Sequence, residues 1–405
     1  MKYIKRSAEN VIKKQEKLFK VILVTGARQV GKTTMLKNLK QNVNYITLDD
    51  MILNQAATED PKLFLKSNQK PLIIDEIQYA PDLLRYIKIE LDNCEEKAMF
   101  YLTGSQQFHL MKDVSESLAG RIGILNLLGL SLREIQEIDF NEPFIPTETY
   151  FEERGKYKKE ISYSEIWDII HKGTMPALYQ EENDFEMFYS MYVNTYIERD
   201  VRNLTQVGDT LTFLKFMTAL ASRIGQLLNL NTVANEVGIS IPTAQRWLSI
   251  LVASNIVYLL EPYYNNIMKR AVKTPKIYFL DTGLVSYLTK WKNRDVLEAG
   301  NMAGSFFENF VIVEIIKSYY NNGELRPPLY FYRDKEKKEI DLIIEQNGEL
   351  HPIEIKKSAN PTKDMISNFK VLEKIGKVGN GGIICMYDKL LDLDEKNKII
   401  PYTYL

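Results

Sequence analysis

A glycine-rich stretch with one lysine and two threonines, GARQVGKTT, carries the strongest chemical signal in the sequence. Four residues separate Gly26 from Gly31, and Lys32 and Thr33 follow at once. This is the spacing of a P-loop, in which backbone N–H groups cradle a phosphate chain, the lysine reaches the outer phosphates and the threonine hydroxyl meets Mg²⁺. The pattern predicts binding of ATP and Mg²⁺. The predicted phosphate-binding set is Gly26, Ala27, Arg28, Gln29, Val30, Gly31, Lys32, Thr33 and Thr34.

A pair of adjacent carboxylates lies further along, in the stretch PLIIDEIQ. Asp75 and Glu76 come directly after apolar residues that predict a buried strand. Two acids at the end of such a strand are unfavourable unless a cation or a reaction uses them. This is the Walker B arrangement, in which Asp75 would hold Mg²⁺ through its water shell and Glu76 would orient and deprotonate the attacking water.

Two further positions near predicted strand ends have open interpretations. Ser105 and Gln106 follow a strand predicted at 99–103. Either side chain would hydrogen-bond the γ-phosphate or the attacking water, or the two residues would simply form a turn. Asp49 and Asp50 follow a strand predicted at 45–48. Carboxylates at this end of a strand lie where ligands bind in open α/β sheets, but an aspartate also caps a following helix.

A second group of acids lies in the last third of the chain. Asp341 falls in a strand predicted at 340–345, and an Asn-Gly step then predicts a tight hairpin turn. On the returning strand Glu354 and Lys356 are two residues apart, so their side chains point to the same face. Glu308 comes near the start of a predicted helix.

This combination of an aspartate, a Glu-x-Lys on the next strand and a helical glutamate resembles the PD-(D/E)xK nuclease pattern. The resemblance implies metal-assisted hydrolysis of a phosphodiester, with Asp341 and Glu354 holding Mg²⁺ or Mn²⁺. Lys356 would position the water or offset charge, and Glu308 would tune the site as a third candidate metal ligand. The alternatives are an exposed charge pair on a strand, or a fold of this kind kept as an inert binding module.

These residues can act together only in a fold that brings the ends of several strands close to one another. Short apolar strands alternate with helical segments over the first third of the chain, which predicts a parallel sheet with its ligands at the carboxyl edge. An amphipathic helix is expected over 1–20. Helical spacing between 131 and 204, interrupted by a connection rich in proline and charge, predicts a helical lid.

The stretch 210–280 has a different organisation. Two predicted helices, 211–224 and 232–237, lead to a glycine-containing turn, after which Ser240 can cap a third helix. Two short strands then complete the pattern of a winged helix. The residues offered to DNA are Thr243, Gln245, Arg246 and Trp247 on the third helix, and Lys269, Arg270, Lys273 and Lys276 on the wing. A role in protein contacts is equally open.

Four motifs together, GARQVGKTT, IIDEIQYAPDLL, YLTGSQQ and SLAGRIG, resemble a prokaryotic AAA-type P-loop ATPase family. The resemblance runs along essentially the whole chain and implies an ATPase core, a winged-helix segment and a C-terminal domain of unknown function with a nuclease-like fold. The expected fold is α/β, a P-loop NTPase with a parallel sheet at 1–135. A helical lid at 136–208, a winged helix at 209–282 and an α/β restriction-endonuclease-like domain at 283–405 are expected to follow.

The resemblance also implies an arginine that completes the ATP site, commonly supplied by a neighbouring subunit of a homo-oligomer. Arg121 in the AGR triplet is the best candidate, because a planar guanidinium can neutralise charge on the transferring phosphoryl group. Arg28 and Arg199 compete for this role, and a structural ion pair is the alternative for Arg121.

Composition limits the class of protein. The 405 residues are 45% apolar and 26% charged, as in an ordinary globular protein, and the net charge of −1 gives no global attraction for nucleic acid. Two cysteines are too few for a disulfide scaffold. We expect no signal peptide and no membrane span, and therefore a cytoplasmic protein.

Three functions are compatible with these observations. The first is a nucleic-acid-acting ATPase, probing DNA with its winged helix, whose C-terminal domain is a metal-dependent nuclease. The second is a regulatory ATP switch whose winged-helix and nuclease-like domains bind partners without cleavage. The third is a chaperone-like or signalling ATPase that is indifferent to DNA.

Overall fold

The computed structural model describes residues 3–104, 114, 117–180, 183–196, 210–264 and 274–405. The chain divides into two compact units. Unit 1 contains the residues up to 130 together with 253–255 and 320–325. Unit 2 contains the remaining residues, and each unit is described by itself. Among the described residues, we find no helix with the length and apolar character that a membrane crossing requires.

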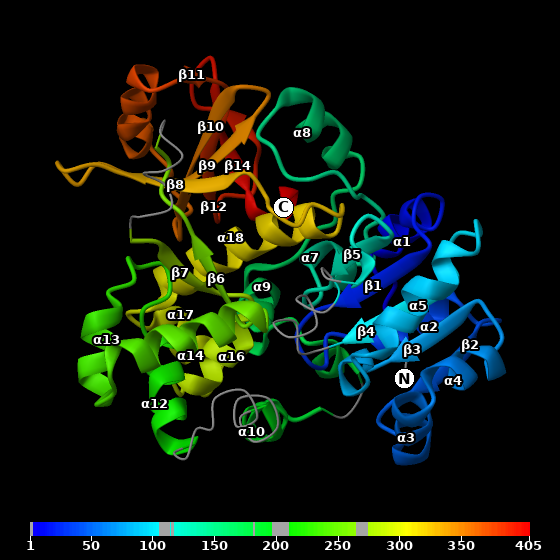
Figure 1. The fold of residues 1–405 in the computed structure, drawn as a ribbon. Helices are drawn as coiled ribbons and strands as arrows, with labels where there is room; N and C mark the ends of the chain where they lie inside the picture. The colour runs from blue at the N-terminus through cyan, green and yellow to red at the C-terminus, as the bar shows by residue number, and fades with distance from the viewer. Residues whose placement is uncertain (1–2, 105–113, 115–116, 181–182, 197–209, 265–273) are drawn as a thin grey trace. The chain divides into compact units, whose positions relative to one another are not determined.

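Unit 1 is built on a five-stranded, entirely parallel sheet with the strand order β2-β3-β4-β1-β5 (blue to cyan in Figure 1). The predicted α/β fold with a parallel sheet is therefore confirmed. Because all strands run the same way, their carboxyl ends meet at one edge. The strands are β1 Val21–Thr25, β2 Asn44–Thr47, β3 Leu72–Asp75, β4 Phe100–Gly104 and β5 Ile122–Asn126.

Helices pack on this sheet and contribute to its core. Side chains from α3, α4 and α5 form one hydrophobic cluster with Val21, Leu23 and Leu72 of the strands. The residues between them in sequence, such as Ile22, are equally buried, as expected for strands covered on both faces. The helices are α1 Glu9–Gln15, α2 Lys32–Leu39, α3 Met51–Glu59, α4 Pro61–Ser67, the 3₁₀ turn η1 Ile77–Tyr79 and α5 Leu83–Asp92.

Two local predictions in unit 1 are corrected or decided here. The helix expected over 1–20 is shorter than predicted, since α1 has only seven residues, Glu9–Gln15. Asp50 caps α3, since its carboxylate accepts hydrogen bonds from the N–H groups of Ile52 and Leu53 at 2.9 and 3.1 Å. Asp50 therefore takes the capping role.

The first half of unit 2 is mainly helical. Several of its helices begin with hydroxyl or amide caps, such as Ser162 before α9 and Asn229 before α13, which satisfy the free N–H groups of the first turn. The elements are α7 Leu132–Ile135, α8 Glu148–Gly155, α9 Tyr163–Lys172, η2 Pro176–Tyr179, α10 Phe185–Tyr196, α12 Thr210–Ala221, α13 Leu230–Val237, α14 Ile241–Ala253, β6 Val257–Leu260, β7 Lys276–Phe279, α16 Thr282–Leu288 and α17 Arg294–Ala299.

The second half of unit 2 is a mixed sheet beside one long helix, α18 Ala303–Tyr320, which is buried along almost its whole length (yellow in Figure 1). The main strand order is β13-β14-β12-β10-β9-β8, with β9 and β10 antiparallel and β10, β12 and β14 parallel. The elements are β8 Leu329–Arg333, β9 Glu339–Gln346, β10 Glu349–Lys356, η4 Lys363–Lys374, β11 Lys377–Val378, β12 Gly381–Cys385, β13 Leu391–Asp392, β14 Asn397–Pro401 and η5 Tyr402–Tyr404.

The hairpin predicted at the Asn-Gly step joins β9 to β10. Asn347 and Gly348 have φ angles of 53° and 76°, the positive values that a tight two-residue turn requires. The segment Lys363–Lys374 forms the 3₁₀ helix η4. The finer division of the chain at residues 136, 209 and 283 stays a prediction.

Candidate functional site

The loop between β1 and α2 has the backbone of a phosphate cradle. Gly26 and Gly31 adopt φ angles of 142° and 92°, which side-chain-bearing residues rarely reach. A Cβ at Gly26 would lie 2.1 Å from the carbonyl oxygen of Leu127. The glycine at position 26 is therefore required by two independent constraints, its backbone angle and the close approach of the chain after β5.

Lys32 lies inside this loop. Its Nζ donates hydrogen bonds to the carbonyl oxygens of Gly26 and Ala27 at 3.1 and 2.8 Å, and the residue is only 7% exposed. The ammonium is thus held at the start of α2, beside the N–H groups of the first helical turn. Those N–H groups and the ammonium together favour an anion at this position.

Asp75 and Thr33 meet as the sequence predicts. The Thr33 hydroxyl donates to the two carboxylate oxygens of Asp75 at 2.8 and 3.0 Å. The Tyr45 hydroxyl donates to the same carboxylate at 2.7 Å, and that of Thr103 does so as well. Burial of Tyr45, followed by its hydrogen bond to Asp75, raises the pKa of the phenol. A hydroxyl and a carboxylate side by side are oxygen ligands of the kind Mg²⁺ prefers, so this pair fits the ion.

Glu76 follows Asp75 in an unusual backbone conformation. Its φ of 57° lies in the left-handed region, which costs about 1 kcal/mol or more in a residue with a side chain. The Glu76 N–H donates to the Thr103 hydroxyl at 3.2 Å, and the Gln78 amide donates to its carboxylate. These contacts hold the strained turn at the end of β3. Such strain is typical of functional positions.

Arg6 is a residue of this site that sequence reasoning missed. It is 3% exposed, and its guanidinium donates to the carbonyl of Val30 at 2.8 Å and to those of Leu128 and Gly129 at 2.8 and 3.2 Å. It thereby connects the P-loop with the segment after β5. The only signal in the sequence is an arginine before a short amphipathic helix, and that pattern does not identify such a role.

The arginine candidates lie in different places. Arg121 precedes β5 at the amino edge of the sheet, one strand length or roughly 16 Å from the P-loop edge, and it pairs with Asp92 at 2.7 Å. In its own chain Arg121 therefore takes part in a structural ion pair. Arg28 is half-buried within the P-loop. Arg199, Ser105 and Gln106 lie outside the described residues.

The C-terminal constellation is brought together as predicted. Lys356 Nζ lies 2.5 Å from Glu354 Oε1 and 3.4 Å from Asp341 Oδ2. The N–H of Ile355 also donates to Asp341 Oδ2, at 2.8 Å. Asp341 and Glu354 are 7% and 8% exposed, so this is a buried cluster and not an exposed charge pair.

An additional lysine lies in the same cluster. Lys276 Nζ is 2.6 Å from Glu339 Oε1, 3.3 Å from Glu308 Oε1 and 3.8 Å from Asp341 Oδ1. Lys276 is 2% exposed. The interpretation of Lys276 as a phosphate-gripping residue of the wing is therefore wrong, because its ammonium is buried among carboxylates.

This lysine decides whether the cluster fits a metal ion. Within the described part of the chain, no three Asp, Glu, His or Cys side chains are arranged as metal ligands. The Lys276 ammonium lies between Glu308 and Asp341, two of the three ligands predicted for Mg²⁺ or Mn²⁺. In this arrangement Glu308, Asp341 and Glu354 do not fit a divalent cation.

Burial shapes the charges of the cluster. Burial and then the charge of Asp341 raise the pKa of Glu354 to about 8, although Lys356 opposes the shift. Burial also raises the pKa of Glu308. Burial pushes the pKa of Lys276 down, but Glu308, Asp341 and Glu339 outweigh it and raise the pKa above its ordinary value. Lys276 is therefore a cation in the folded chain.

The helix-turn-helix elements are present in α13 and α14. Gly238 ends α13 with a φ of 81°, and the Ser240 hydroxyl accepts the N–H of Thr243 at 3.3 Å at the start of α14. Gln245 and Arg246 are exposed on α14. Trp247 was expected to face DNA, but it is 4% exposed and packs on the rings of Phe213 and Phe216, so it belongs to the core.

The strands after α14 form the antiparallel pair β6–β7. The connection between them includes Lys269, Arg270 and Lys273, which lie outside the described residues. Of the α14 side chains predicted to contact DNA, Gln245 and Arg246 are therefore exposed, and Thr243 is half-buried.

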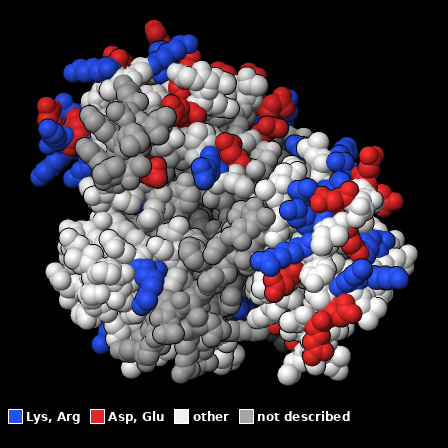
Figure 2. Space-filling view, in the orientation of Figure 1, with Lys and Arg blue, Asp and Glu red and all other residues white. Residues whose placement is uncertain are grey.

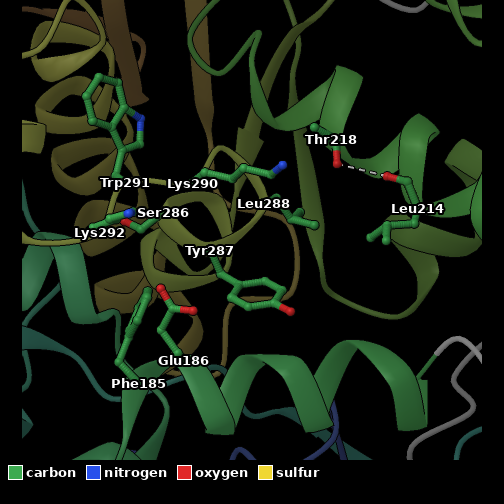
Figure 3. Close-up of a pocket in the computed structure, with 10 residues that line it drawn as sticks. All are labelled: Phe185, Glu186, Leu214, Thr218, Ser286, Tyr287, Leu288, Lys290, Trp291 and Lys292. Atoms are coloured by element: carbon green, nitrogen blue, oxygen red, sulfur yellow. Dashed lines mark hydrogen bonds between the residues drawn. The ribbon is translucent and has the colours of Figure 1, made fainter.

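A separate pocket of about 360 Å³ lies in unit 2 (Figure 3). Its wall combines aromatic rings with two lysines, and the Thr218 hydroxyl in it donates to the carbonyl of Leu214 within the same helix. No residue predicted for chemistry belongs to its described lining. The lining residues are Phe185, Glu186, Leu214, Thr218, Ser286, Tyr287, Leu288, Lys290, Trp291 and Lys292.

Comparison with protein families identifies the class of the N-terminal part. Residues 18–136 match an AAA domain. This match agrees with the parallel sheet and the P-loop described above and supports an AAA-type P-loop fold for unit 1. Residues 163–295 and 303–405 match two domains of unknown function, DUF8612 and DUF4143. The predicted C-terminal domain of unknown function is thus confirmed.

Two relatives and two solved structures are similar to large parts of this chain. An uncharacterised protein of Mycobacterium tuberculosis and one of Mycobacterium bovis are each 29% identical over 344 residues, covering 84% of this chain and 71% of theirs. Among solved structures, the Walker-type ATPase of Pyrococcus abyssi aligns at 12% identity and a TM-score of 0.44, over 69% of this chain and 94% of its own. A Thermotoga maritima RuvB variant aligns at 16% identity and a TM-score of 0.30, over 62% and 85%.

Proposed function

We propose that this protein binds and hydrolyses ATP with Mg²⁺ at the P-loop of unit 1. The observation that carries the proposal is the hydrogen bond from Thr33 to Asp75, beside the buried ammonium of Lys32. These three residues come from two separate stretches of sequence, and the sheet places them at one edge. The AAA domain match supports the same activity.

Each side chain then has a defined task. Lys32 exchanges the carbonyls of Gly26 and Ala27 for phosphate oxygens, and the N–H groups at the start of α2 bind the same phosphates. Thr33 and Asp75 would hold Mg²⁺, and the ion would supply positive charge to offset that of the phosphates. Glu76 orients the attacking water and accepts its proton.

The arginine that completes the site is proposed to come from a second copy of the chain. Arg121 lies at the far edge of its own sheet, so it would act in a neighbouring subunit of a homo-oligomer, after leaving Asp92. The ion pair is more than a third exposed on both sides, so breaking it requires little free energy. Arg28, inside the P-loop, is the alternative within one chain.

Contact with DNA is proposed through α14 of a winged helix formed by α12, α13, α14 and the β6–β7 pair. Gln245 and Arg246 are exposed there. Their side chains can donate hydrogen bonds to acceptor atoms of base edges and phosphates. On the face drawn in Figure 2, basic and acidic side chains are interspersed at the right and the upper left of the described surface, and few charges lie at its lower left, where Figure 1 places α12, α13 and α14. Binding to DNA would therefore be local and of modest strength. A cytoplasmic location agrees with this function.

Between the proposed roles of the C-terminal domain, the structure favours binding without cleavage. Asp341, Glu354 and Lys356 are assembled as in the nuclease-like pattern, which supports a restriction-endonuclease-like fold. The position of Lys276 argues against metal-dependent cleavage. The proposed function is therefore an ATP-driven switch, with the winged helix and the C-terminal domain as its binding modules.

The test is ATP hydrolysis by the full chain with Mg²⁺, with and without duplex DNA. The wild-type chain should release phosphate, and Lys32→Ala should reduce turnover by about 100-fold or more. Lys62→Ala, an exposed lysine on α4, is the matched control and should not change the rate. Turnover that survives Lys32→Ala would show that the phosphate release comes from elsewhere.

The role of DNA is measured in the same assay. Stimulation by DNA that disappears in the Arg246→Ala variant supports recognition through α14. ATP turnover that is indifferent to DNA, with no DNA retained in an electrophoretic shift, would contradict the nucleic-acid part and leave a protein-directed switch.

A further inference from the structure

The acidic cluster of unit 2 contains more charged groups than the nuclease-like pattern includes. Its carboxylates are Glu308, Glu339, Asp341 and Glu354, and its cations are Lys276, Lys356 and Arg333. Lys276, Glu339 and Arg333 were not part of the predicted site. Four acidic side chains thus lie among three cations of the chain itself.

Lys276 occupies the side of the cluster that Lys356 does not reach. Lys356 pairs with Glu354 Oε1 and Asp341 Oδ2, whereas Lys276 lies nearest to Glu339, Glu308 and Asp341 Oδ1. The two ammonium groups therefore face different oxygens of Asp341. The Tyr278 hydroxyl adds a hydrogen bond of 2.7 Å to Glu308 Oε1.

The backbone that carries Lys276 is fixed. Phe279 of β7 exchanges two hydrogen bonds with the amide of Asn309 on α18, at 2.9 and 2.8 Å. The antiparallel pairing with β6 holds the strand from its other side, where Leu260 lies opposite Lys276. The lysine is thus delivered to the acids by a strand that is tied to the helix bearing Glu308.

A divalent metal ion cannot share this position. Metal ligands approach to about 2.0–2.6 Å, and the ion would lie between oxygens that already flank the Lys276 ammonium. Metal binding would first have to expel a 2% exposed lysine from its carboxylate partners, which leaves a buried charge uncompensated.

We propose that Lys276 is a built-in cation that takes the place of a divalent metal in the acidic cluster. The cluster is then a metal-free set of ion pairs that connects β7, α18 and the sheet. The C-terminal domain accordingly does not cleave phosphodiesters. This inference is independent of ATP hydrolysis in unit 1, since the two sites share no residue.

The test is Mn²⁺ binding to the nucleotide-free full chain, measured by electron paramagnetic resonance of free Mn²⁺. An Asp75→Asn background removes the carboxylate of the nucleotide site from the measurement. With Lys276 present, no Mn²⁺ should bind up to about ten times the concentration that half-saturates the Lys276→Met variant. Lys276→Met should gain one Mn²⁺ site, and adding Asp341→Asn should abolish it.

Three controls keep the result interpretable. Lys377→Met removes an exposed lysine that pairs with Glu349 and should create no site. Lys276→Met/Glu308→Gln removes one charge of each sign and should restore folding if the single variant unfolds. In that double variant Asp341 and Glu354 remain, so weak Mn²⁺ binding is still expected.

Two results would overturn the inference. One is Mn²⁺ binding by the chain with Lys276 intact that disappears in Asp341→Asn. The other is failure of both folded Lys276 variants to bind Mn²⁺, because the lysine would then not be what excludes the metal. Loss of ATP hydrolysis with an unchanged Mn²⁺ pattern would contradict the function proposed for unit 1 and leave this inference standing.

Discussion

The hydroxyl of Thr33 donates to both oxygens of the Asp75 carboxylate, at 2.8 and 3.0 Å. Forty-two residues separate the two side chains in sequence, and the parallel sheet brings them to one edge. The contact connects the start of α2 directly to the end of β3.

The Tyr45 hydroxyl is a further support of Asp75. We expect Tyr45→Phe to lower the stability of unit 1 by about 1 kcal/mol, since a partly buried, charge-assisted hydrogen bond is lost. The KM for ATP should rise a few-fold because the carboxylate is less well oriented. Tyr101→Phe removes a similar bond, to Glu16, and should leave KM unchanged. Equal effects of both variants on KM would show that Tyr45 has no special role at the site.

Gly26 is predicted to tolerate no side chain. Gly26→Ala places a Cβ against the carbonyl of Leu127 and strains a φ of 142°, so unfolding should become easier by about 2–4 kcal/mol and ATP binding should be lost. Gly120→Ala is the control, since its φ is also positive at 75° but nothing lies within 4 Å of the new Cβ. Urea unfolding and binding of a fluorescent ATP analogue measure both effects. Normal ATP binding by Gly26→Ala would contradict the close packing seen here.

Arg6 is predicted to position the P-loop from the N-terminal segment. Arg6→Ala leaves three carbonyl groups without their donor, and we expect about tenfold weaker ATP binding. Arg6→Lys, which can replace one of the bonds, should recover part of the affinity. Lys13→Ala on the exposed side of α1 should have no effect. A fall in stability without any change in ATP affinity would make Arg6 purely structural.

The raised pKa of Glu354 predicts a pH dependence of stability. Because the folded chain keeps a proton on this group up to about pH 8, whereas the unfolded chain releases it near its ordinary value of 4.5, stability falls as the pH rises between these values. From pH 6 to pH 9 this group alone should remove about 2–3 kcal/mol. Glu354→Gln should abolish that part of the change in urea unfolding. An identical pH dependence in both proteins would show that Glu354 is ionised throughout.

The nucleotide site was largely predictable from sequence, for physical reasons that particular residues illustrate. Gly26, Lys32 and Thr33 lie within eight residues, so their spacing alone specifies the loop. Asp75 ends an apolar strand, and the rule that parallel strand ends share an edge places it near Thr33. The Asn347-Gly348 turn and the two strands beside it were predictable in the same way.

Other features depend on contacts that no local pattern encodes. Arg6 binds a carbonyl 122 residues away, and Tyr45 binds an acid thirty residues on. Lys276 lies in a strand whose four residues are all buried, so alternation does not show that its ammonium meets three acids. The prediction that Trp247 contacts DNA was wrong, because helical periodicity does not distinguish a DNA-binding face from a face packed in the core.

The most direct measurement of the proposed ATPase site separates ATP binding from ATP turnover in Glu76→Gln. This variant keeps Lys32, Thr33 and Asp75 but replaces the group that takes the proton from water. We predict that it binds a fluorescent ATP analogue with Mg²⁺ about as tightly as the wild-type chain, while its turnover falls by about 100-fold or more. Wild-type turnover in Glu76→Gln, or absence of Mg²⁺-dependent ATP binding in the wild-type chain, would contradict the account.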